Sequence, residues 1–366
     1  MAWMSRENRL YEEFKRASPT SRIDTPEWSV TGLAPRAVAA SPNGAFLAVG
    51  TFFGTVAVLD ARTGRCVRRH DHAYKSIESV DVSCDSRWVV STSWEKFTFV
   101  VEIGGTTTIK TFVDEHYSYD ARFSPDGRRI AVVSTANTVN IWSLDTNECV
   151  RRIPCHEAAC YVEWIPNTNL IATCTKYLSG QLHVWDIESG ALRRAIGFGD
   201  VVRSSVSPDG RRILTASGDG RTVHVWSVDS PEQDPVTYKT LVAGPHATEF
   251  RTTGSGLGFL GLAVSPNSKR FAVALDDRVL VWSFSSPFPL YVVPLRKDDN
   301  VWSVHFVGPH DDTIATMTRE KAVEVWDLRR SFRMAILAAL GHPGWTRFLL
   351  DKDGDHAIAS RVVGFS

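Results

Sequence analysis

The chain has 366 residues, 41 of them basic and 41 acidic, and this balance gives no bulk attraction to nucleic acid or membranes, so we expect neither as a partner. No apolar stretch approaches the roughly 20 residues that span a bilayer, and the first residues lack the apolar core of a secretory signal. Six cysteines without a disulfide framework fit a reducing compartment, so we expect a cytoplasmic or nuclear protein.

The first predicted element is a short amphipathic helix. Trp3, Leu10, Tyr11 and Phe14 fall on one face at helical spacing. We assign residues 1–26 to this helix and its linker. Two roles are open for the helix: packing on the rest of the chain, or docking on a partner.

From residue 27 onward the chain repeats one pattern about every 42 residues. Ser-Pro-Asp-Gly-Arg-Arg-Ile stands at 124–130 and again at 207–213, and Cys-Val-Arg-Arg stands at 66–69 and again at 149–152. One insertion, between residues 229 and 262, interrupts the period. Equivalent anchor positions, taken at the Ser of Ser-Pro-(Asp/Asn), are Ser41, Ser83, Ser124, Ile165, Ser207, Ser265, Val307 and Asp351.

Each unit predicts four short strands. Pro fixes its own φ, and Gly or Asn accepts a positive φ, so each anchor marks a hairpin turn between the first two strands. A third apolar run follows, as at 182–186, and then a more polar fourth run, as at 149–153.

This pattern resembles the WD-repeat family of β-propellers. The resemblance rests on the Trp-Asp pairs at 185–186 and 326–327, the Gly-His pair at 341–342 and the period of the repeat. It covers residues 27–366 and implies an all-β fold, a closed propeller of four-stranded blades.

Eight anchors predict eight blades, with seven, the commoner number in the family, as the alternative. Residues 361–366 align with 278–283, which is the third strand of an earlier unit. Because an unpaired sheet edge promotes aggregation, we expect a further strand to complete this last blade. Residues 27–33 are the candidate, and the expected pairing is with Val362–Phe365.

The leading functional interpretation is a non-catalytic scaffold or adaptor that presents its loops to a protein or peptide. The sequence contains no Ser-His-Asp signature, phosphate loop, paired catalytic carboxylates or metal cluster, so we predict no catalytic residue, cofactor or metal site. The alternative is a propeller enzyme or small-ligand-binding propeller with its site in the central channel. Its candidate residues would be His116, His156, His183 and His224.

One candidate partner surface lies in the loops. In this fold the loops between second and third strands, and between each fourth strand and the next unit, gather on one face. Aromatic side chains supply much of the binding energy at interaction hot spots, which favours this face in the first four units. The candidate residues are Phe52, Phe53, Tyr74, Trp94, Tyr117 and Tyr177.

A second candidate surface is the tetrapeptide at 326–329. Trp-Asp-Leu-Arg is similar to the W-D-x-R motif by which substrate receptors dock on the adaptor of cullin-type ubiquitin ligases. The resemblance implies Trp326, Asp327 and Arg329 as docking residues. Trp-Asp is common in this fold, so the alternative is an ordinary exposed turn.

Overall fold

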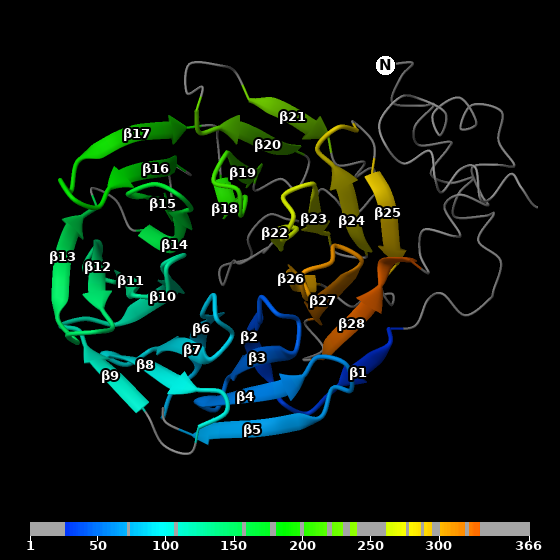
Figure 1. Cartoon of the computed structure of the whole chain (residues 1–366), viewed down its shortest axis with the longest axis horizontal. Helices are drawn as coiled ribbons and strands as arrows, with labels where there is room; N and C mark the ends of the chain where they lie inside the picture. The colour runs from blue at the N-terminus through cyan, green and yellow to red at the C-terminus, as the bar shows by residue number, and fades with distance from the viewer. Residues whose placement is uncertain are drawn as a thin grey trace, which may run out of the picture.

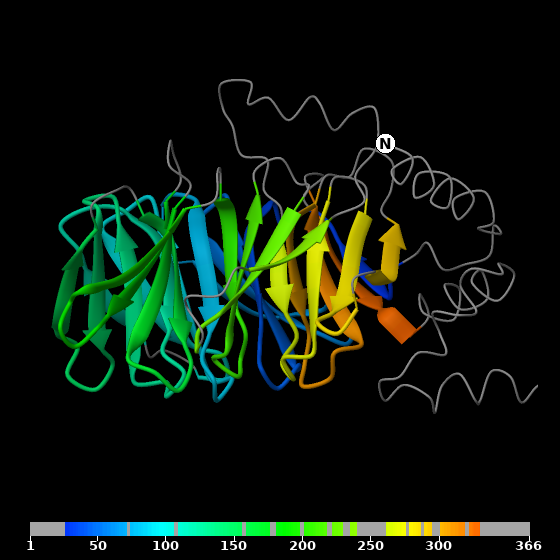
Figure 2. The same ribbon diagram turned by 90° about the horizontal axis from the view of Figure 1, so that it is seen from above.

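The computed structural model shows a ring of seven four-stranded antiparallel sheets, or blades (Figure 1). The strands of each blade run between the two faces of the ring (Figure 2). Within the part of the chain that it describes, no helix is long and apolar enough to cross a membrane. The described residues are 26–71, 74–105, 109–155, 159–175, 181–197, 201–217, 222–229, 235–239, 261–275, 278–286, 289–294, 301–318 and 322–329.

The strands follow one another blade by blade, from the innermost strand to the outermost. Blade 1 consists of β2 (Pro35–Ala40), β3 (Phe46–Thr51), β4 (Thr55–Asp60) and β5 (Cys66–Asp71). Blade 2 consists of β6 (Ile77–Val82), β7 (Trp88–Ser93), β8 (Phe97–Glu102) and β9 (Ile109–Val113). Blade 3 consists of β10 (Ser118–Phe123), β11 (Arg129–Ser134), β12 (Thr138–Ser143) and β13 (Cys149–Pro154). Blade 4 consists of β14 (Ala159–Ile165), β15 (Leu170–Thr175), β16 (Gln181–Asp186) and β17 (Leu192–Gly197). Blade 5 consists of β18 (Val201–Val206), β19 (Arg212–Ser217), β20 (Thr222–Ser227) and β21 (Val236–Lys239). Blade 6 consists of β22 (Leu262–Val264), β23 (Arg270–Ala274), β24 (Arg278–Ser283) and β25 (Pro289–Pro294). Blade 7 consists of β26 (Val301–Phe306), β27 (Thr313–Thr318), β28 (Val323–Asp327) and β1 (Trp28–Val30).

The first seven anchors lie at the turn between the first two strands of a blade, as predicted. In the repeated heptapeptide, Ser124 Oγ accepts a hydrogen bond from Arg129 N at 2.9 Å. Gly127 takes a φ of +69°, and its N–H donates to Ser124 O at 2.8 Å. Ser207 and Gly210 repeat the same arrangement in blade 5. The buried serine thus closes the turn, and the glycine supplies the conformation that the turn requires.

The hydrophobic core is divided among the interfaces between neighbouring blades. Seven apolar clusters each join two adjacent blades, and the second and third strands contribute most of their residues. These strands are covered on both faces, which explains their nearly continuous apolar runs. The outermost strands have one open edge, and β5 and β13 are accordingly largely exposed.

The ring closes after seven blades, so the prediction of eight blades is wrong and the alternative of seven is confirmed. Val307, Ala315 and Met317 of blade 7 pack directly on Val38 and Leu47 of blade 1. This contact leaves no room for another blade between them.

The closing strand is β1, which binds the outer edge of β28 (Figure 1). Trp28 pairs with Val325 and Val30 pairs with Val323. The segment near 27–33 thus supplies a fourth strand to β28, and the predicted partner Val362–Phe365 lies outside the described residues. The eighth anchor at Asp351, like the predicted helix within residues 1–26, lies outside the described residues.

Candidate functional site

The centre of the ring contains a cavity of about 110 Å³. Its walls come from the innermost strands of blades 1, 2, 3, 4, 5 and 7, with Met317 of β27. The innermost strands face one another across the centre (Figure 1). Three arginines and two carboxylates from these strands line the cavity: Arg36, Arg122, Arg203, Glu78 and Asp120.

The repeat explains where the charges lie. Seven equivalent positions stand two residues before the first seven anchors, and we call them the inner ring. They are small in blades 1, 5 and 6 and ionisable in blades 2, 3, 4 and 7, and of these seven residues Arg122 and His305 line the cavity. The inner ring consists of Ala39, Asp81, Arg122, Glu163, Ser205, Ala263 and His305.

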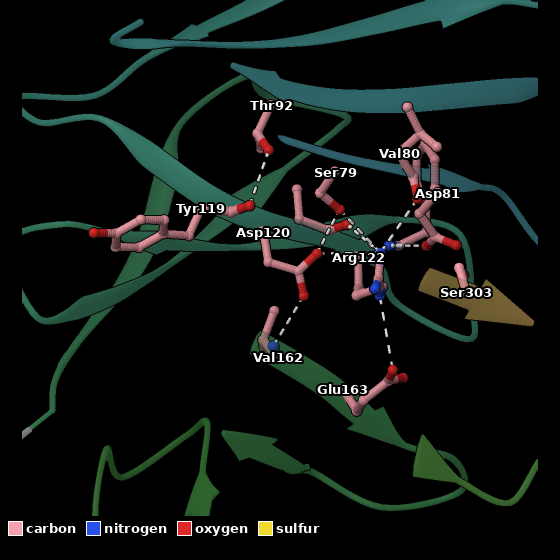
Figure 3. A network of polar contacts seen from close by, with 12 residues as sticks. Ser79, Val80, Asp81, Thr92, Tyr119, Asp120, Arg122, Val162, Glu163 and Ser303 are labelled. Carbon is pink, nitrogen blue, oxygen red and sulfur yellow. Dashed lines mark hydrogen bonds and ion pairs between the residues drawn. The ribbon is translucent and has the colours of Figure 1, made fainter. Parts of the chain in front are cut away.

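Arg122 is the centre of a polar network that links blades 2, 3 and 4 (Figure 3). Its Nη1 donates to Ser79 Oγ at 3.1 Å and to Val80 O at 3.2 Å. The same nitrogen lies 3.2 Å from Asp120 Oδ1, and Nε lies 3.8 Å from Glu163 Oε1. One guanidinium therefore contacts side chains or backbone of three successive blades.

Two carboxylates of this network bind backbone amides of the next blade. Asp120 is 1% exposed; its Oδ1 accepts a hydrogen bond from Ser79 Oγ, and its Oδ2 accepts one from Val162 N at 3.1 Å. Asp81 Oδ2 accepts a hydrogen bond from Phe123 N at 2.9 Å. These contacts fix the spacing of the inner strands, so the network has a structural role whatever the channel binds.

Burial shifts the pKa of three side chains of the inner ring. Burial raises the pKa of Glu163 to about 7 and that of Asp81 to about 6, and in both cases the attraction of Arg122 only partly opposes it. Burial, followed by repulsion from Arg122 and Arg203, lowers the pKa of His305 to about 3. His305 is therefore neutral at pH 7, whereas Glu163 changes its charge in the neutral range.

We expect Glu163→Gln to stabilise the protein at pH 8 but not at pH 5. The pKa of Glu163 is higher in the folded chain than its ordinary value of 4.5, so wild-type stability falls as the pH rises from about 4.5 to about 7. The gain at pH 8 is about 1–2 kcal/mol, because the side chain, 30% exposed, keeps partial access to water. Urea unfolding at both pH values measures it.

Glu148→Gln, on an exposed turn, is the matched control for this pH test and should leave the pH profile unchanged. A Glu163→Gln protein that is less stable than wild type at pH 8 would contradict the argument. It would mean that attraction to Arg122 outweighs the cost of burial.

The structure brings several predicted aromatic residues to one face of the ring. We call it the loop face; it carries the β3–β4, β5–β6, β7–β8 and β9–β10 loops. Phe53 and Tyr74 are 76% and 99% exposed, and Trp94 and Tyr117 are each 41% exposed. The rings of Trp94 and Tyr117 lie 6.3 Å apart between centroids.

The other two predicted aromatic residues do not join this exposed group. Phe52 is half-buried, and the guanidinium of Arg36 lies over its ring at 5.2 Å. Tyr177 lies outside the described residues. Sequence reasoning missed Tyr119, whose ring packs edge-on against Trp94 at 6.0 Å and whose residue also lines the central cavity.

The candidate docking residues lie at the end of blade 7. Trp326 is buried, and its Nε1 donates to Thr316 Oγ1 at 3.0 Å. Arg329 is exposed, and its Nη2 lies 2.9 Å from Asp327 Oδ2. Its Nε also lies 3.4 Å from Asp312 Oδ2. Trp326 therefore has a packing role, and only Arg329 presents a largely exposed side chain.

The histidines of the alternative interpretation do not form a common site. His183 and His224 are bonded within their own blades, to Gln181 at 2.9 Å and to Thr237 at 3.0 Å. His116 is exposed near the loop face, and His156 lies outside the described residues. In the part of the chain that the structure describes, no three His, Cys, Asp or Glu residues are placed to hold a metal ion.

Comparison with known proteins agrees with this architecture. The family model described as "WD domain, G-beta repeat" matches residues 107–143, 147–186 and 197–227. WD repeat-containing protein 3 of Mus musculus and that of Homo sapiens are each 32% identical over 158 residues, 42% of this chain. The matched segment spans only 16% of the length of these relatives.

A solved structure with the same architecture is the β-propeller domain of Cps50 (Swd1) from Myceliophteria thermophila. It superposes with a TM-score of 0.69 over 83% of this chain and 99% of that domain, at 14% sequence identity. Such a low identity shows the fold alone. Together with the three matched repeats and the seven-bladed ring, it supports a WD40 β-propeller fold for this chain.

Proposed function

We propose that this propeller is a non-catalytic interaction scaffold whose loop face binds a protein or peptide. Propellers of this family typically bind protein partners. The observation that carries the proposal is the exposure of Phe53, Tyr74, Trp94 and Tyr117, which come from four successive loops of one face. Exposed aromatic side chains gathered in this way are typical of binding hot spots.

Contacts between the loops support a preformed surface. Trp94 N donates to Ser76 O at 3.4 Å, and Tyr74 N donates to Glu95 Oε1 at 3.2 Å. These bonds join the β5–β6 loop to the β7–β8 loop. A surface whose loops already hold one another loses less conformational entropy on binding.

We expect Phe53→Ala/Tyr74→Ala to lose the partner of the loop face. Both side chains are largely exposed, so the change should leave folding intact while removing about 2 kcal/mol or more at each hot-spot position, an affinity loss of about 30-fold for each position. Affinity capture from native lysate, followed by titration of the captured partner, measures the loss.

Val67→Ala/Val150→Ala is the matched control, because it removes two exposed apolar side chains from outermost strands. Capture by this control should equal that of wild type. If the loop-face variant melts like wild type and keeps every partner, the loop face is not the binding surface.

A finer proposal, that one partner is the adaptor of a cullin-type ubiquitin ligase, depends on Arg329. Docking through the guanidinium would exchange its contact with Asp327 for one with the adaptor. In the same capture, Arg329→Ala should then lose that adaptor alone. Arg193→Ala is the control, because Arg193 forms an equivalent 2.6 Å ion pair with Asp186 in blade 4. Retention of the adaptor by both variants would rule out this docking mode.

A further inference from the structure

Three exposed aromatic side chains of the loop face carry hydrogen-bond donors that the propeller does not use. Tyr74 and Tyr117 each carry a hydroxyl, and Trp94 carries its indole Nε1–H. None of these three groups has a hydrogen-bond partner among the residues that the structure describes. By contrast, the indole N–H groups of the buried Trp185 and Trp226 donate to threonine hydroxyls of their own blades. The donors of the loop face are therefore available to a partner.

The backbone of the same loops is already occupied. Trp94 N donates to Ser76 O at 3.4 Å, which joins the β7–β8 loop to the β5–β6 loop. Asp114 N donates to Lys96 O at 2.8 Å, which joins the β7–β8 loop to the end of β9. A peptide that adds a β-strand needs free backbone amides, and these two are used. Recognition here must depend on the aromatic rings and on their polar atoms.

The charges of these loops that reach solvent cancel one another. Among the described loop residues they are two lysines, Lys75 and Lys96, and two glutamates, Glu95 and Glu115. Lys75 is itself held by the aromatic group, because its Nζ lies 5.5 Å from the ring centroid of Tyr117. A surface without excess charge favours neither an acidic nor a basic segment, so its complement is an uncharged segment.

A polyproline II helix is an uncharged segment that offers free carbonyl groups. This conformation has three residues per turn, a rise of about 3.1 Å per residue and no internal hydrogen bonds, so its carbonyls can accept hydrogen bonds from a partner. An α-helix uses most of its carbonyls internally and cannot meet the same donors through its backbone. One turn of polyproline II, about 9 Å long, also spans the 6.3 Å between the ring centroids of Trp94 and Tyr117.

We propose that the loop face binds a proline-rich, uncharged segment of a partner protein in the polyproline II conformation. This inference rests on the proposed function and names the class of partner for that surface. Proline rings of the segment stack on Trp94 and Tyr117, and its carbonyls accept hydrogen bonds from Trp94 Nε1 and from the hydroxyls of Tyr74 and Tyr117. Such a segment is stiff before it binds, so it loses little conformational entropy.

The test is calorimetric titration of the full chain with a synthetic oligoproline of about ten residues, roughly three turns of polyproline II. A Gly-Ser peptide of the same length is the control ligand, because it is uncharged but flexible. We expect saturable binding of the oligoproline and no binding of the Gly-Ser peptide.

Three variants separate the aromatic rings from their donors. Trp94→Phe and Tyr117→Phe each keep an aromatic ring and remove one hydrogen-bond donor, so each should weaken binding about fivefold. Tyr74→Ala removes a side chain that is 99% exposed, so folding should be intact and binding should weaken at least about tenfold. The control Val67→Ala/Val150→Ala should bind like wild type.

Absence of saturable oligoproline binding by the wild type would overturn the proposal, and so would wild-type affinity in the Tyr74→Ala protein. The capture experiment distinguishes this failure from a failure of the proposed function. If Phe53→Ala/Tyr74→Ala loses a captured partner that oligoproline does not displace from the wild type, the loop face binds a partner but its ligand is not proline-rich. If that variant keeps every partner, the loop face itself is not the binding surface.

Discussion

A chain that lacks residues 1–30 should melt about 8 °C lower than a chain that lacks residues 1–25. The five residues that differ contain β1, the strand that covers the edge of β28. Loss of its ladder and of the packing of Val30 removes about 4 kcal/mol, and each kcal/mol shifts the melting temperature by about 2 °C in a domain of this size. The exposed β28 edge should also promote self-association, which light scattering detects.

The comparison of these two truncations isolates β1 from the segment that precedes it. Removal of residues 330–366 is a second control, and it asks whether the last unit of the sequence takes part in ring closure. Closure through β1 and β28 predicts that this truncation keeps cooperative unfolding. Equal melting of the 1–25 and 1–30 deletions would show that β1 does not hold the ring.

We expect the second large loss of stability from Asp120→Ala. The substitution leaves Val162 N without its acceptor, the Ser79 hydroxyl without the carboxylate to which it donates, and Arg122 without its nearest carboxylate. Removing one partner of a buried ion pair typically costs about 3–5 kcal/mol. Thermal and urea unfolding should both show the loss.

Two further variants test this explanation of the Asp120 effect. Asp120→Asn keeps an oxygen for Val162 N but not the charge, so we expect a smaller loss. Arg122→Met in the Asp120→Ala background should cost less than the sum of the two single changes, because the residues share one network. Full additivity would contradict the coupling of blades 2, 3 and 4 through Arg122.

Much of the fold could be predicted from the repeat. The anchors located seven hairpin turns, and in five of them the anchor serine closes the turn through a short-range bond that sequence spacing reveals. The blade count could not be predicted in the same way. Residues 361–366 carry the pattern of a third strand, but closure depends on which distant strand reaches the edge of β28, and the local pattern does not encode that choice.

The candidate sites, too, could be predicted only in part from the sequence. Exposed aromatic residues could be chosen from loop positions, and Phe53, Tyr74, Trp94 and Tyr117 do lie at the loop face. The charged network around Arg122 was missed because Asp81, Arg122 and Glu163 are about 41 residues apart and form no local motif. A comparison of the position two residues before each anchor would have found them, since every such residue belongs to an innermost strand.

The pairing of β1 with β28 also sets the order of events during synthesis. Trp28 and its partner Val325 are 297 residues apart, so blades 1 to 6 can form in sequence before the partner strand of β1 has been made. At about 5–20 residues per second, the ribosome needs about 15–60 s to make the interval between them. During that time the ring is not closed, and the nascent protein has an exposed sheet edge at each end. Chaperones, or the solubility of these edges, must protect the protein until β28 has been made.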